Sequence, residues 1–178
     1  MKQDIILFQV LILFSRFKIK TIKLNNKINK TYMEEVKLAE ILLIEDNPGD
    51  ARLTQEALKD GKMKINLSIV YDGEEGTDFL YKRNKYKDAP RPDLIILDLN
   101  LPKKNGREVL AEIKNDDNLK MIPVIILTTS KAQEDILKTY NLHANCYITK
   151  PIDLAKFFEV VKLIEGFWLT LVKLPTHE

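Results

Sequence analysis

Polar residues suited to phosphoryl transfer stand at the ends of four apolar runs in this chain. They are Glu45, Asp46, Asp98, Thr128 and Lys150. Crowded carboxylates repel one another unless a pKa is raised or a cation binds between them. Oxygen ligands without histidine or cysteine favour a hard cation, and Mg²⁺ accepts a few carboxylates together with waters and phosphate oxygens. The set therefore indicates a magnesium site that can receive a phosphoryl group.

Asp98 is the nucleophile that this chemistry requires. Beside a bound Mg²⁺, its carboxylate would attack phosphorus and form an acyl phosphate. Lys150 would neutralise charge on the equatorial oxygens, and Thr128 would donate a hydrogen bond to one of them. A single acid after a strand is more often a helix cap or a solvated side chain. The coincidence of the whole set at successive strand ends is what indicates function.

Composition excludes several other kinds of site. The single cysteine, Cys146, excludes a disulfide framework and a cysteine-rich metal cluster. The two histidines, His143 and His177, argue against a histidine metal site or a Ser-His-Asp triad. With 178 residues, 45% hydrophobic and 30% charged, the chain is expected to form one globular domain with an appendage.

Charge is unevenly distributed along the chain. Residues 1–32 hold seven basic and one acidic side chain, whereas the remainder holds 21 basic and 25 acidic ones. The pI of about 8.5 therefore comes from the N-terminal segment, and the main domain is mildly acidic. We expect no nucleic-acid partner for that domain, because nucleic-acid binding requires a basic surface.

Short apolar runs alternate with amphipathic stretches from residue 40 onward, which predicts strands and helices around a parallel sheet. The expected strands are 41–44, 65–70, 94–97, 124–128 and 144–148. The expected helices are 48–59, 73–83, 107–115, 132–140 and 154–163, and 84–92 is expected to be a loop. A doubly wound α/β sheet places its ligands beyond the carboxyl ends of the strands, where the polar set stands.

Residues 1–38 form an N-terminal extension that is apolar and then basic. The run Ile5–Phe14 is too short to span a bilayer, which needs about 20 residues. Three interpretations stay open: an interfacial membrane segment, an extra packed element, or translated upstream sequence outside the natural protein. We favour the third, because Met33 stands just before a well-formed domain start. Membrane contact is expected only if this segment belongs to the natural protein.

The ordered motifs resemble the receiver domain of two-component response regulators over residues 39–165. These motifs are ED at 45–46, DLNLP from Asp98, LTTS with Thr128 and YITKP with Lys150. The spacings of 30 residues from Asp98 to Thr128 and 22 from Thr128 to Lys150 also suit that family. The resemblance implies a flavodoxin-like α/β fold, with a doubly wound five-stranded parallel sheet in strand order 2-1-3-4-5 and five helices.

The resemblance also implies a role for each residue of the set. Asp98 would accept phosphate from a phosphohistidine on a sensor histidine kinase. Mg²⁺ would be held by Glu45, Asp46 and Asp98, directly or through water, together with the backbone carbonyl of Asn100.

Other roles follow from the same resemblance. Thr128 and Lys150 would contact the phosphoryl group. Tyr147 stands where the family has its aromatic switch, which turns inward as Thr128 shifts toward the phosphate. The Lys150–Pro151 bond is expected to be cis, an isomer that X-Pro linkages tolerate.

Finer features resemble the small stand-alone regulators that serve bacterial phytochrome kinases. They are EDNPGDARLTQEALK, ANCYITKP and IEGFWLTLVKLP. Two positions depart from the commonest pattern: Glu45 stands where Asp is more usual, and Thr129 stands where Ala or Gly is common. Residues 166–178 form a C-terminal tail, in which Phe167 and Trp168 are expected to contribute a dimer contact because they exceed what one core face needs.

The expected function is phosphorylation-dependent signalling in the cytoplasm by a protein that is not an enzyme, apart from catalysing its own phosphorylation and dephosphorylation. About thirteen residues follow residue 165, so output is expected through protein contacts, including a homodimer, without a DNA-binding domain. One alternative is an aspartyl-phosphate phosphatase of the haloacid dehalogenase kind. Such enzymes need a second acid two residues after the nucleophile, where this chain has Asn100. The other alternative is a phosphorylation-independent binding module, against which the intact acidic set argues.

Overall fold

The computed structural model describes residues 38–61 and 63–175. The expected N-terminal extension therefore lies outside the described residues, except for Leu38. Within the described part of the chain, no helix is long and apolar enough to cross a membrane.

Five parallel strands form one sheet at the centre of the domain. They are β1 (Ala39–Ile44), β2 (Ile65–Val70), β3 (Leu94–Leu97), β4 (Val124–Thr128) and β5 (Cys146–Thr149). Their order in the sheet is β2-β1-β3-β4-β5, and every neighbouring pair is parallel. The predicted strand order is confirmed.

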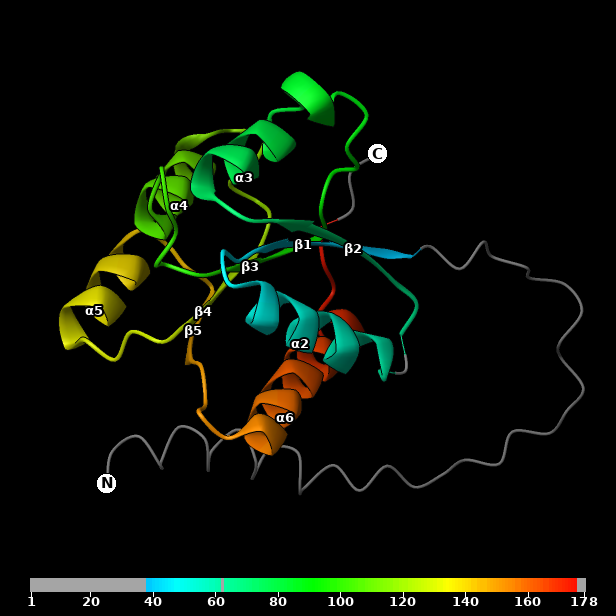
Figure 1. The fold of residues 1–178 in the computed structure, drawn as a ribbon. Coiled ribbons are helices and arrows are strands. Elements are labelled where there is room, and N and C mark those ends of the chain that lie inside the picture. Colours follow the sequence, from blue (N-terminus) through cyan, green and yellow to red (C-terminus); the bar gives the residue numbers. More distant parts are fainter. Residues whose placement is uncertain (1–37, 62, 176–178) are drawn as a thin grey trace, which may run out of the picture. The chain divides into compact units, whose positions relative to one another are not determined.

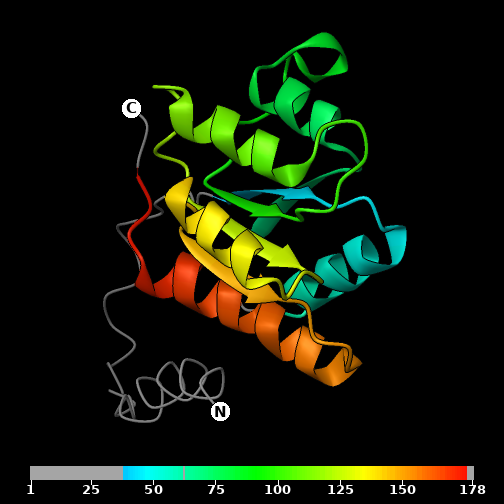
Figure 2. The same cartoon turned by 90° about the vertical axis from the view of Figure 1, so that its left-hand side faces the viewer.

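Five helices connect and cover these strands. They are α2 (Pro48–Lys59), α3 (Gly73–Leu80), α4 (Gly106–Asn115), α5 (Gln133–Asn141) and α6 (Leu154–Glu165). Helices α2 and α6 lie on one face of the sheet, and α3, α4 and α5 lie on the other (Figure 1). The view turned by 90° shows the sheet between α4 and α6 (Figure 2). The doubly wound α/β architecture is therefore confirmed.

Strand β3 is the most deeply buried part of the core, because helices cover both of its sides. All four of its residues, Leu94–Leu97, have no exposed surface. Alternate side chains enter two apolar clusters: Ile95 and Leu97 face α3 and α4, whereas Leu94 and Ile96 face α2 and α6. A strand covered on both sides needs an uninterrupted apolar run, which is the pattern seen in the sequence.

The segment that follows α3 differs from prediction in two ways. Helix α3 ends at Leu80 rather than residue 83, because Lys82 and Asn84 both adopt a positive φ of 53° that a helix cannot accommodate. A single 3₁₀ turn, Asn84–Tyr86, lies in the segment expected to be a loop. The prolines that disfavour helix follow this turn.

Strand β5 begins two residues later than predicted, at Cys146. The side-chain oxygen of Asn145 accepts a hydrogen bond from the backbone N–H of Val124 at 2.9 Å. It also accepts one from the ammonium of Lys114 at 3.0 Å. The Asn145 side chain thus takes the N–H of Val124, the first residue of β4. The regular pairing of β5 with β4 therefore starts one residue later, between Cys146 and Ile125.

The chain continues beyond α6 in a π-helical turn, Gly166–Leu171. Trp168 is half-buried and packs against the apolar cluster beneath α2 and α6. Phe167 and Leu171 are 43% and 62% exposed. The two aromatic residues expected at a dimer contact therefore differ: Phe167 faces solvent, whereas Trp168 contributes to its own domain.

Candidate functional site

Backbone pairing brings the predicted polar residues together at one edge of the sheet. Asp98 follows β3, and its N–H donates to the carbonyl of Ile44 at the end of β1, at 3.0 Å. Lys150 follows β5, and its N–H donates to the carbonyl of Thr128 at 2.7 Å. The register of the strands therefore places Glu45 beside Asp98, and Thr128 beside Lys150.

The Asp98 carboxylate lies at the centre of this group and is 4% exposed. Its Oδ1 accepts a hydrogen bond from the Thr128 hydroxyl at 2.7 Å and from the Asn100 N–H at 3.0 Å. Its Oδ2 accepts one from Lys150 Nζ at 2.6 Å. Three donors from three segments thus fix the orientation of the carboxylate.

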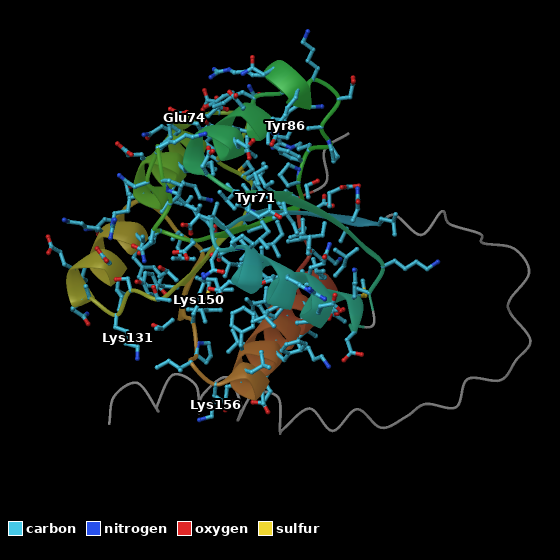
Figure 3. The ribbon with its side chains drawn as sticks, in the orientation of Figure 1. Tyr71, Glu74, Tyr86, Lys131, Lys150 and Lys156 are labelled. Carbon is cyan, nitrogen blue, oxygen red and sulfur yellow. The ribbon has the colours of Figure 1, made fainter. Side chains whose placement is uncertain are left out.

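Lys150, which is labelled in Figure 3, is buried. Its ammonium contacts three carboxylates. Nζ lies 2.5 Å from Glu45 Oε2, 2.6 Å from Asp98 Oδ2 and 3.0 Å from Asp50 Oδ2. Burial lowers the pKa of Lys150, but its hydrogen bonds to Asp98 and Glu45 outweigh that effect and raise the pKa above its ordinary value. The ammonium therefore stays charged and offsets part of the negative charge of the site.

Asp50 is a member of this group that the sequence reasoning missed. It lies in the first turn of α2, where the Asn47 side chain caps the helix by accepting hydrogen bonds from the N–H groups of Gly49 and Asp50. The sequence feature that could have indicated Asp50 is its position four residues after Asp46. A helix that starts directly after a strand keeps its first turn beside the end of that strand, and Asp50 lies in that first turn.

Glu45 is 2% exposed. Burial raises its pKa to about 7, against the opposing effect of the hydrogen bond and charge of Lys150. The backbone N–H of Asn47 also donates to Glu45 Oε1, at 3.3 Å. A carboxyl group in this environment takes up a proton near neutrality unless a further positive charge approaches it.

The oxygen atoms present at this site fit a magnesium ion. One carboxylate oxygen each from Glu45, Asp46 and Asp98 can be chosen so that all lie within 4.8 Å of one another. Asp46 is exposed, so the group opens to solvent on one side. All these donors are oxygen, and the opening leaves room for the waters that Mg²⁺ retains.

Asn100 lies at the same edge of the sheet. The contacts it makes there involve its side-chain amide and its backbone N–H, whereas the expected contact involved its backbone carbonyl. Its side-chain amide lies 3.3 Å from Thr129 Oγ1 and 3.5 Å from Thr128 Oγ1, and its N–H bonds Asp98. The role of its backbone carbonyl as a metal ligand stays a prediction.

Tyr147 is half-buried and lies two hydrogen bonds away from Thr128. Its hydroxyl donates to the carbonyl of Ser130 at 3.0 Å, and the N–H of Ser130 donates to Thr128 Oγ1 at 3.4 Å. Ser130, which the sequence analysis did not single out, is therefore the link between the two residues of the expected switch.

The expectation of a cis Lys150–Pro151 bond is wrong for this structure, since the described residues contain no cis peptide bond. Trans is the lower-energy isomer of X-Pro bonds by about 0.5–1 kcal/mol. Lys150 Nζ reaches both Asp98 and Glu45 with the bond in trans, so the contacts seen here do not require the less favourable isomer.

The tail residues do not join this group. Phe167 and Trp168 follow the C-terminal end of α6, whereas Lys150 precedes its N-terminal end. A helix of 12 residues separates its two ends by roughly 18 Å. The two rings contact each other edge to face, with centroids 5.5 Å apart.

Comparison with known proteins identifies relatives of the whole domain. Residues 41–162 match the response regulator receiver domain family. The chain is 52% identical over 135 residues to response regulator Rcp1 of Synechocystis sp. (strain ATCC 27184 / PCC 6803 / Kazusa), covering 76% of this chain and 92% of Rcp1.

Solved structures give the same result. The phosphorylated cyanobacterial phytochrome response regulator RcpA is 51% identical with a TM-score of 0.77, and the match covers 79% of this chain and 100% of RcpA. The Mn²⁺-bound form of Rcp1 is 51% identical with a TM-score of 0.76, covering 78% of this chain and 99% of that one. Its fold, its motifs and these matches agree, and the chain belongs to the response regulator receiver domain family.

Proposed function

We propose that Asp98 accepts a phosphoryl group from a phosphohistidine of a sensor histidine kinase in a Mg²⁺-dependent reaction. The observation that carries this proposal is the convergence of Lys150, Thr128 and the Asn100 N–H on the Asp98 carboxylate. These donors lie beside the oxygens that would attack phosphorus, so Lys150 and Thr128 are already close to where the phosphoryl oxygens, which carry the negative charge during transfer, would arrive.

In the proposed reaction, a carboxylate oxygen of Asp98 attacks phosphorus while the phosphorus–nitrogen bond of the phosphohistidine breaks. The electron pair of that bond returns to the imidazole, which takes up a proton, and Asp98 becomes an acyl phosphate. Water later cleaves the acyl phosphate, which restores the carboxylate and releases inorganic phosphate.

Other residues of this chain would bind the metal ion and contact the transferred phosphoryl group. Glu45, Asp46 and Asp98 would hold the metal ion, which supplies charge neutralisation for the transferred group. Lys150 Nζ, already 2.6 Å from Asp98 Oδ2, would follow the new phosphoryl oxygens. The Thr128 hydroxyl, now bonded to Asp98 Oδ1, would turn to one of those oxygens. The relative Rcp1 has been crystallised in a Mn²⁺-bound form, which supports a divalent cation at this site.

We further propose that the kinase is of the phytochrome type and that the regulator acts in the cytoplasm. The support is the likeness to a cyanobacterial phytochrome response regulator, RcpA, over 79% of this chain. The signal would pass on through protein contacts.

A homodimer is part of this proposal. Exposed apolar side chains on α5 and the tail support it, namely Leu137, Tyr140, Phe167 and Leu171, whose exposed fractions lie between 43% and 62%. Apolar groups left exposed at the surface in this number are typical of an interface.

Mass spectrometry of the intact protein tests the proposed phosphorylation. Incubation with Mg²⁺ and acetyl phosphate should add the mass of one phosphate, and EDTA should prevent it. Asp98→Asn keeps the shape of the side chain but should remain unmodified. Asp117→Asn, an exposed control that loses only an ion pair with Lys120, should be modified like the wild type. An unmodified wild type under saturating donor would contradict the proposal and favour a phosphorylation-independent binding module.

A further inference from the structure

Asp50 is held in the first turn of α2 by hydrogen bonds to both polar groups of its backbone. Its N–H donates to the side-chain oxygen of Asn47, the residue that caps the helix, at 3.2 Å. Its carbonyl accepts a hydrogen bond from the hydroxyl of the buried Thr54 at 2.9 Å. The N-terminal end of a helix attracts negative charge, so a carboxylate is a favourable side chain at this place. The Asp50 carboxylate therefore projects from a fixed backbone.

Lys150 meets this carboxylate although it lies 100 residues further along the chain. Its ammonium stands on a flexible four-carbon stem, which by itself allows Nζ many positions. Nζ has three N–H groups to donate. It donates hydrogen bonds to one oxygen each of Glu45, Asp98 and Asp50. Three acceptors from three segments thus fix the ammonium and use all of its N–H groups.

The three acceptors differ in the other tasks that they would perform. Glu45 and Asp98 belong, with Asp46, to the group of carboxylates that can hold a metal ion. Asp98 is also the proposed phosphoacceptor. Asp50 is not a member of that group, and its side chain is 29% exposed. Its contact with Lys150 is therefore the one for which neither the metal ion nor the phosphoryl group competes.

A hollow of about 250 Å³ lies beside this contact. Asp50, Lys150 and Thr129 are the polar residues that line it. The other lining residues are apolar: Leu53, Pro151, Ile152, Leu154 and Phe157. No second carboxylate lines the hollow, so none stands ready there to take the place of Asp50 as a partner of the ammonium.

We propose that Asp50 is a positioning residue for Lys150, which keeps the ammonium beside Asp98 while a metal ion and a phosphoryl group bind. This proposal rests on the proposed function, in which Lys150 follows the phosphoryl oxygens on Asp98. One N–H of the ammonium stays on Asp50, and the others are free to turn to those oxygens. A charged donor that is held in place before transfer stabilises the transition state without a cost of reorganisation. Asp50 contacts neither phosphorus nor metal in this account and acts only through Lys150.

The test measures the phosphorylation of Asp98 by acetyl phosphate, with saturating Mg²⁺, in the full chain. Asp50→Ala should lower the maximal rate by roughly three-fold or more, which is a fraction of the loss that follows removal of a whole transition-state donor. The maximal rate is the readout because the loss of a negative charge also changes the attraction of the anionic donor, which alters the half-saturating donor concentration. Asp50→Asn keeps an oxygen acceptor at the same place and should recover most of the rate.

Glu74→Ala is the matched control. It removes an exposed carboxylate from the first turn of α3, at the same edge of the sheet (Figure 3). The change in charge and the position in a helix are therefore the same as in Asp50→Ala, but Lys150 keeps its three partners. The maximal rate of this variant should equal that of the wild type.

A double-mutant cycle tests whether Asp50 acts through Lys150. In protein that carries Lys150→Met, Asp50→Ala should cause no further loss of rate, whereas a purely structural role would give the same loss in both backgrounds. The NMR signal of the Lys150 ammonium is a second readout should Lys150→Met fold poorly, which thermal unfolding reports. Asp50→Ala should shift this signal, and Glu74→Ala should leave it in place.

Three results would each overturn the proposal. They are a wild-type maximal rate for folded Asp50→Ala, an equal loss of rate in the two backgrounds, and an unchanged ammonium signal in Asp50→Ala. Failure of the wild type itself to acquire phosphate would instead overturn the proposed function.

Discussion

Lys150 and Asp98 form a buried ion pair of 2.6 Å that reaches across an intervening strand, because β4 lies between β3 and β5. The same ammonium lies 2.5 Å from Glu45, which follows β1. One positive charge therefore balances carboxylates from two other strands. A divalent cation at this site would share with Lys150 the carboxylates that now surround it.

Lys150→Met should strongly destabilise the metal-free protein. The change keeps most of the side-chain volume but leaves Glu45 and Asp98 buried without a positive partner. Breaking such a pair from one side costs about 3–5 kcal/mol. Urea unfolding in EDTA measures the loss, and millimolar Mg²⁺ should restore part of it. Lys156→Met, at an exposed position on α6, is the control (Figure 3). Equal stability of the two variants in EDTA would show that Lys150 does not balance this charge.

Mg²⁺ binding should tighten as pH rises through about 7. Burial raises the pKa of Glu45 to about 7 in the metal-free protein, so protons occupy part of this group at lower pH. A cation binds only the deprotonated carboxylate, and a higher pH removes the competing proton. Calorimetric titration with Mg²⁺ between pH 6 and 8 measures the trend. Glu45→Gln should bind more weakly and lose most of the dependence, and a flat profile for wild type would refute this competition.

Substitution of the two neighbouring aromatic residues of the tail should have different effects on self-association and on stability. Phe167 is 43% exposed, so Phe167→Ser should lower self-association in sedimentation velocity while leaving the melting temperature nearly unchanged. Trp168 packs against the cluster beneath α2 and α6, so Trp168→Ser should lower the melting temperature. An unchanged sedimentation coefficient for Phe167→Ser would remove this residue from the dimer contact.

Two glycines should respond oppositely to alanine. Gly106→Ala should destabilise the fold by about 1–3 kcal/mol, because overpacking forces backbone shifts. Its Cβ would meet the Asp98 carbonyl oxygen at 2.1 Å and Leu99 Cα at 2.7 Å. A Cβ atom at Gly166 would meet nothing within 4 Å, and the backbone there is right-handed helical. Gly166→Ala should therefore be neutral or should stabilise the fold by about 0.4–1 kcal/mol. Urea unfolding compares the two, and equal effects would contradict the close approach of α4 to Asp98.

The sheet, and the edge of it that carries the site, could be predicted because a strand buried on both faces has an uninterrupted apolar sequence. The apolar run of β3 can be recognised from the sequence of that segment alone. The acidic residue that follows it, Asp98, marks the end of the strand. The alternation of such runs with amphipathic helices fixes parallel pairing, and parallel pairing brings Glu45, Asp98 and Lys150 to one edge.

Features set by single side chains could not be predicted in this way. The late start of β5 depends on the Asn145 amide, which bonds Val124 across the strand gap. The role of Ser130 depends on distances between elements that no periodicity encodes. The isomer of the Lys150–Pro151 bond depends on a small energy difference, and the expectation of cis was wrong here.

Chemical trapping of the acyl phosphate is the most direct test of the central claim that Asp98 is the phosphoacceptor. Borohydride reduces an acyl phosphate on aspartate to homoserine, which marks the residue permanently for peptide sequencing. After incubation with Mg²⁺ and a phosphoryl donor, we predict homoserine at position 98 and aspartate at positions 46 and 50. Homoserine at either of those positions, or none at position 98 in protein that carries phosphate, would contradict the account.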